Sequence, residues 1–103
     1  MNGKAKLMKL YVIVRKDLSV SQRAVQAGHV VAQFCLYGPF SRWHNGTLIY
    51  LGIKNLEELE KLMNQLSNNN NKYTEFREPD IGNQVTAIAT DQHDKLFERM
   101  RLL

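Results

Sequence analysis

The sequence has little of what disulfide-stapled, fibrous or membrane-spanning proteins depend on. One cysteine among 103 residues excludes an internal disulfide and any cysteine-rich zinc site, and is typical of a reducing compartment. Two prolines and six glycines exclude collagen-like and disordered chains. No apolar run approaches the roughly 20 residues of a membrane helix, and residues 10–14 are too short for a signal-peptide core. We therefore expect a cytoplasmic protein with one domain over residues 1–103.

The charge balance is mildly basic, with a formal net charge of +4 and a sequence pI of about 9.4. Such a balance favours an anionic partner, although many small basic proteins bind no nucleic acid. No segment is a dense Lys/Arg tract, so a basic tail that acts by charge alone is excluded.

The hydrophobic pattern predicts a small α/β domain. Strands are expected at residues 10–14, 47–53, 72–77 and 84–90, and helices at about 21–36 and 56–66. A third helix is expected to open at Asp91, with Leu96, Phe97 and Met100 facing inward. Strands joined through helices run parallel by right-handed crossovers, so the order β-α-β-α-β-β-α predicts three layers around a four-stranded mixed sheet with helices packed on it.

Ligands of such sheets bind beyond the C-terminal ends of the strands. Arg15, Asp17 and the start of the first helix are therefore expected on a functional rim. Ser19 and Gln22 have the spacing of a capping box. The free amides of this helix start also suit an anion, although almost every helix start offers the same.

The first helix carries a stripe of neutral polar residues, at Gln22, Gln26, His29 and Gln33. A solvated stripe would normally hold Glu and Lys. The stripe therefore indicates partial burial against a ligand, a partner subunit or the sheet; the alternative is an exposed histidine among glutamines. The side that meets the sheet is predicted to consist of small and apolar residues, namely Ala24, Val25, Gly28, Val31 and Ala32.

Several segments together resemble a known family. They are Val14-Arg15-Lys16-Asp17-Leu18, Gln26-Ala27-Gly28-His29-Val30, Phe76-Arg77-Glu78 and residues 82–89. These segments, with the order of strands and helices, are similar to the second class of peptidyl-tRNA hydrolases, the archaeal and eukaryotic type. The similarity covers about residues 9–103.

The resemblance implies hydrolysis of the ester that joins a peptide to the tRNA 3′ end, by a homodimer without a metal or other cofactor. The expected partner is peptidyl-tRNA or another nucleotide-containing ligand, with no membrane. His29, Gln22 and Glu78 hold the positions expected to be catalytic; His29 has the residue type for proton transfer near neutrality. The residues expected to bind substrate are Arg15, Asp17, Arg23, Gln26, Arg77 and Asn83.

Two departures from the family pattern stand out. Gln22 occupies the place of a lysine thought to be catalytic, and Arg23, about 100° further round the helix, replaces it only by swinging back. The stretch after Glu78 is shortened to Pro79-Asp80-Ile81, and Asn83 stands where the family has threonine. A non-catalytic binding module on the same fold, for a nucleotide, a tRNA end or a protein, is therefore the alternative.

The remaining chemistry-bearing residues point to less. Trp43, beside Arg42 and His44, either stacks on a base or folds back onto the core. Cys35 lies nearly opposite His29 on the helix, which predicts a packed thiol and no Cys-His dyad. The three histidines lack zinc-ligand spacing, so no metal is expected.

The site prediction is a single polar cleft. The glutamine stripe shares one helix face, and the strands that end at Arg15 and at Glu78 must be parallel to share a rim. The cleft would hold Arg15, Asp17, Arg77 and Glu78 around His29. The alternative is that Arg15–Glu78 and Asp17–Arg77 are structural ion pairs and that the glutamine face is a dimer contact.

Overall fold

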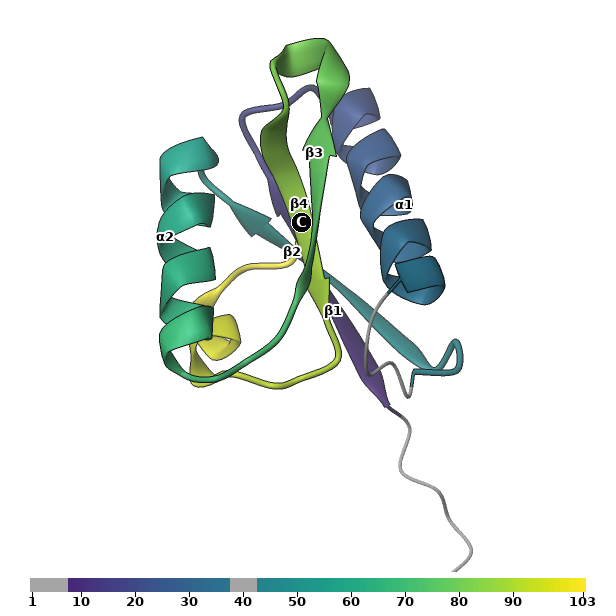
Figure 1. Cartoon of the computed structure of the whole chain (residues 1–103), viewed down its shortest axis with the longest axis vertical. Helices are drawn as coiled ribbons and strands as arrows, with labels where there is room; N and C mark the ends of the chain where they lie inside the picture. Colours follow the sequence, from purple (N-terminus) through teal and green to yellow (C-terminus); the bar gives the residue numbers. More distant parts are fainter. Residues whose placement is uncertain (1–7, 38–42) are drawn as a thin grey trace, which may run out of the picture.

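A four-stranded mixed sheet forms the middle of the computed structural model, which describes residues 8–37 and 43–103 (Figure 1). The strands are β1 (Lys9–Arg15), β2 (Thr47–Ile53), β3 (Thr74–Glu78) and β4 (Gln84–Thr90), and their order is β2-β1-β4-β3. β1 is parallel to β2, and β4 is antiparallel to both β1 and β3. β1, β2 and β3 therefore all end at the same rim, as predicted.

Two helices cover opposite faces of this sheet: α1 (Val20–Tyr37) and α2 (Leu56–Asn68) (Figure 1). Alternation along β1 explains the two cores, because successive side chains of a strand point to opposite faces. Leu10, Val12 and Val14 pack with α1, whereas Tyr11 and Ile13 pack with α2. The predicted three-layer α/β fold is confirmed.

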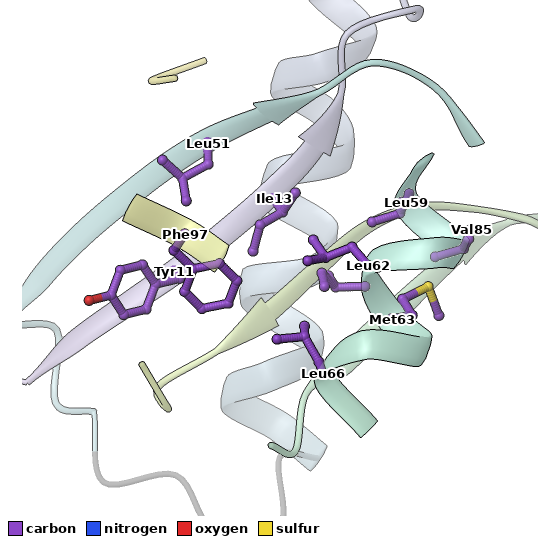
Figure 2. Packing of buried hydrophobic residues seen from close by; sticks show 10 residues of the cluster. Tyr11, Ile13, Leu51, Leu59, Leu62, Met63, Leu66, Val85 and Phe97 are labelled. Atoms are coloured by element: carbon purple, nitrogen blue, oxygen red, sulfur yellow. The ribbon is translucent and has the colours of Figure 1, made fainter. Parts of the chain in front are cut away.

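A leucine-rich stripe of α2 packs on its face of the sheet (Figure 2). Leu59, Leu62, Met63 and Leu66 are buried and lie with Tyr11 and the other residues of that core. Asn55 caps the helix by accepting a hydrogen bond from the Glu58 amide at 3.0 Å. The helix therefore begins where the sequence predicts, and it extends two residues further, to Asn68.

The predicted third helix is wrong in type and in start. A 3₁₀ helix, η2 (Lys95–Arg99), follows Asp94 and not Asp91. Asp94 is buried and accepts hydrogen bonds from the Leu96 amide and from the side chains of Asn69 and Asn71. These hydrogen bonds make the 3₁₀ helix begin after Asp94. The chain becomes extended at Met100, and the Gly52 amide donates to the Arg101 carbonyl at 3.0 Å. Phe97 is buried, and Leu96 and Met100 pack against the core as predicted.

The sheet-facing side of α1 also differs from the prediction. Ala24, Val25, Gly28 and Ala32 are exposed and Val31 is half-buried; the residues that face the sheet are Gln26, Ala27, Val30 and Phe34. The prediction gave the sheet-facing side to small and apolar residues and expected only partial burial of the glutamine stripe, because an unpaired amide is costly to bury fully. Gln26 is buried because other side chains satisfy its amide. Within residues 8–37 and 43–103, no helix is long and apolar enough to cross a membrane.

Candidate functional site

The end of β1 carries a buried arginine whose partners are all supplied by the protein. Arg15 is 6% exposed. It donates to both carboxylate oxygens of Asp17, at 3.0 and 2.8 Å, and to the Val85 carbonyl and the Gln84 side chain. Hydrogen bonds from Arg15 are the largest cause that lowers the pKa of Asp17. The bonds to Val85 and Gln84 tie β1 to β4. Arg15 and Asp17 neutralise each other as an ion pair.

The third strand ends on different pairings from those considered in either sequence hypothesis. Arg77 forms an ion pair with Glu75 at 3.0 Å and donates to the Asn83 carbonyl at 3.3 Å. Arg15–Glu78 and Asp17–Arg77 pairs are not formed, because each arginine has a nearer carboxylate two residues away on its own segment. Arg77 lines a pocket with Met63 of α2, on the face of the sheet opposite to α1, so the predicted placement of Arg77 beside His29 is wrong.

A buried glutamine connects α1 to β3 and β4. Gln26 is 1% exposed. Its amide nitrogen donates to Glu78 at 2.8 Å and to Gln22 at 3.3 Å, and its oxygen accepts from the Thr86 hydroxyl at 2.6 Å. We call Gln22, Gln26, Glu78 and Thr86 the Gln26 cluster. It joins the start of α1 to β4 and the end of β3.

Glu78 is held in place by the shortened turn. Its second oxygen accepts from the Asp80 amide at 3.3 Å, which caps the 3₁₀ helix η1 (Pro79–Ile81). Gly82 and Asn83 then adopt left-handed conformations, with φ of 67° and 59°. The pKa of Glu78 is lowered, first by the Gln26 hydrogen bond, then by that of Asp80, and by the charge of His29. The carboxylate is therefore ionised at neutral pH.

His29 lies next to this cluster, one turn along α1 from Gln26. It is exposed, and its ring stacks flat on Phe76 of β3, with centroids 4.4 Å apart and planes 3° apart. A flat stack fixes the plane of the imidazole ring on Phe76. Neutral imidazole can take a proton from water, and a nearby carboxylate stabilises the imidazolium that results.

Hydrogen bonds at the start of α1 fix the roles of Gln22 and Arg23. The side-chain oxygen of Gln22 accepts a hydrogen bond from Gln26, which leaves the nitrogen of this exposed amide as a donor. The Arg23 guanidinium donates to Leu18 O at 3.0 Å and to Lys16 O at 2.6 Å. Arg23 therefore holds the loop and does not swing back into the lysine position. The Ser19 hydroxyl accepts from the Gln22 amide at 3.2 Å, one half of the predicted capping box.

The predicted residues thus separate into two groups. Gln22, Gln26, His29 and Glu78 come together, whereas Arg15, Asp17 and Arg77 serve as structural pairs. Thr86 was missed by sequence reasoning, although a threonine in the otherwise apolar run 85–89 was a signal for it. Gln33 is half-buried further along α1. Asn83 shapes the turn by donating its amide to Glu78 O at 3.0 Å.

The remaining predictions have separate outcomes. Trp43 is buried on the α1 face and donates to the Thr47 carbonyl at 3.0 Å, so the core alternative is confirmed and base stacking is wrong. Arg42 lies outside the described residues. Cys35 is exposed, so the packed thiol is wrong. In the part of the chain that the structure describes, no group of three His, Cys, Asp or Glu side chains could hold a metal ion.

Comparison with known proteins supports the fold. No protein-family profile matches the chain, and no curated protein does. Among solved structures, the chain is similar to Atu0240 of Agrobacterium tumefaciens strain C58, a protein of unknown function. The two are 17% identical with a TM-score of 0.66, over 96% of this chain and 99% of that one. This likeness is one of architecture alone.

Proposed function

We propose that this chain hydrolyses the ester of a peptidyl-tRNA, as the resemblance to the second class of peptidyl-tRNA hydrolases implies. The observation that carries the proposal is the Gln26 cluster with His29 beside it. It sets an ionised carboxylate, an exposed imidazole and a Gln22 amide on one side of α1 and β3. The expected setting is the cytoplasm, where translation supplies the substrate, and the expected assembly is a homodimer.

In the proposed reaction, His29 takes a proton from water as the water oxygen bonds to the ester carbonyl carbon. Glu78 stabilises the imidazolium, and the Gln22 amide donates to the carbonyl oxygen as negative charge develops there. The ester C–O bond then breaks, and the ribose oxygen takes the proton back from His29. Free peptide and free tRNA are the products.

A second function rests on a specific observation. Gln22 is uncharged, and Arg23 is committed to two loop carbonyls. Among the described residues, no lysine or arginine is hydrogen-bonded to the Gln26 cluster, where it could stabilise an oxyanion. This favours a non-catalytic module that recognises a nucleotide, a tRNA end or a protein partner.

A peptidyl-tRNA hydrolysis assay separates the two functions. His29→Ala is expected to lower kcat by about two to four orders of magnitude, the usual scale for an acid–base group. His44→Ala is the matched control, because His44 is also exposed but lies before β2. Turnover that His29→Ala leaves unchanged would remove His29 from the mechanism. Binding of tRNA without any turnover would establish the binding module.

A further inference from the structure

A basic pocket lies on the other side of the sheet from His29, and the proposed reaction does not use it. It has a volume of about 470 Å³ and is formed by the ends of β1 and β2, α2 and the C-terminal segment. The volume is within the range of pockets that hold small molecules.

Five cationic side chains line this pocket against one carboxylate, that of Glu58. The cations come from four separate segments: Lys16, Lys54, Lys61, Arg99 and Arg101. Within residues 8–37 and 43–103, none of these five side chains forms an ion pair with a carboxylate. Gathering like charges without counter-ions is unfavourable, and a bound polyanion would relieve the repulsion.

The backbone around these cations is fixed by hydrogen bonds. The Lys16 amide donates to Ile53 O at 2.7 Å, and its carbonyl accepts from Arg23. The Lys16 side chain lies across Gly52, where an added Cβ would be only 2.7 Å from its Cδ. The Gly52 amide also donates a hydrogen bond to the Arg101 carbonyl at 3.0 Å. Lys16 and Arg101 are thus held at one place, at the C-terminal ends of two parallel strands, where α/β sheets bind ligands.

The floor of the pocket is apolar. Leu62 is buried, and Ile53, Leu96 and Met100 pack against the α2-side core. Gln65 adds an exposed amide with both donors and an acceptor. A ligand that combines several negative charges with an apolar portion carrying hydrogen-bonding groups would therefore match this lining.

We infer that this pocket binds a nucleoside di- or triphosphate, with the phosphates on the five cations and the base over the floor. Such a ligand carries about three to four negative charges and matches the excess of cations over Glu58. The inference is independent of ester hydrolysis, because no residue of the Gln26 cluster lines the pocket.

Calorimetric titration of the full chain with ATP, ADP and pyrophosphate tests the inference. Saturable binding is expected, with ADP at least about tenfold tighter than pyrophosphate because the base adds apolar contact. Lys61→Ala and Arg99→Ala should each weaken ADP about tenfold, the scale of one charge-assisted hydrogen bond. Both residues are exposed, so the variants are expected to fold.

Lys95→Ala is the matched control, because it removes the same charge from an exposed lysine outside the pocket. Its affinity for ADP should stay within about twofold of the wild-type value, a smaller change than the loss of one charge-assisted hydrogen bond would cause. His29→Ala should also leave ADP binding unchanged, which separates this site from the proposed hydrolysis.

Three results would overturn the inference. The first is the absence of saturable binding by either nucleotide. The second is pyrophosphate binding as tightly as ADP, which would mean an anion site without a base. The third is an equal loss of ADP affinity in Lys95→Ala and Lys61→Ala, which would mean a diffuse basic surface.

Discussion

Replacing Gln26 by leucine tests whether the buried amide stabilises the fold. The side chain is 1% exposed and Thr86 is 0% exposed. Without Gln26, the Thr86 hydroxyl keeps only the Phe76 carbonyl at 3.5 Å, a long hydrogen bond. An unsatisfied buried hydroxyl costs about 1–3 kcal/mol, partly offset by the apolar surface that leucine buries. We expect the free energy of unfolding to fall by about 2 kcal/mol and Tm to fall by about 8 °C.

The same substitution should change the pH dependence of stability. The Gln26 hydrogen bond is the largest cause that lowers the pKa of Glu78. A carboxylate with a lowered folded pKa stabilises the fold above its ordinary pKa, and that stabilisation is lost as the pH falls through the folded pKa. The difference between wild type and Gln26→Leu should therefore shrink in acid.

Urea unfolding at pH 7 and at about pH 3 measures both effects, and a ¹³C titration of the Glu78 carboxyl should show its pKa rising in the variant. Gln33→Leu is the matched control, since it makes the same change two turns along α1, where the side chain is half-buried. Equal stability of wild type and Gln26→Leu, or an equal loss in Gln33→Leu, would refute the reasoning.

Three further outcomes are expected. Asp17→Asn should lower the free energy of unfolding by about 1 kcal/mol at neutral pH, because the charge of Arg15 is then uncompensated. Since the pKa of Asp17 is lowered in the folded protein, this difference from wild type should vanish as the pH falls. A difference in urea unfolding that stays constant with pH would contradict this. Gly82→Ala should destabilise the protein by about 1 kcal/mol because Gly82 has a left-handed φ, whereas Gly28→Ala, in the middle of α1, should stabilise it by about the same amount. A Tm that shifts in the same direction in both variants would be inconsistent with this account. Gln22→Lys should raise peptidyl-tRNA hydrolysis, and an inert but folded variant would point to the shortened turn as the obstacle.

The local hydrophobic pattern was enough to predict the strands of the sheet, but not the side-chain hydrogen bonds between distant segments. The strands 47–53 and 84–90 match the predicted bounds because their apolar runs end at polar or turn residues. Gln26 could not be assigned to the interior, because its partner Thr86 is sixty positions away in the sequence. A polar stripe on a helix therefore predicts that a face is unusual, but not which of its residues is buried.

The last helix shows the same limit at a shorter range. Asp91 and Asp94 are equally good capping residues by type. The asparagines after α2 decide between them, since Asn69 and Asn71 both bond Asp94. The run of four asparagines at residues 68–71 therefore contains two specific donors, and only the folded chain brings them to the carboxylate.

The strand order has a consequence for how the protein is made. The central pair of the sheet joins β1 to β4, with Tyr11 opposite Thr90, so the first strand to leave the ribosome waits for the last one. Until then, β1, α1 and β2 present one unpaired edge of β1 and apolar surface on the α2 side. Such an edge readily pairs with another chain. Slow translation after β2 should therefore lower the yield of folded protein, whereas a chaperone that shields the β1 edge should restore it.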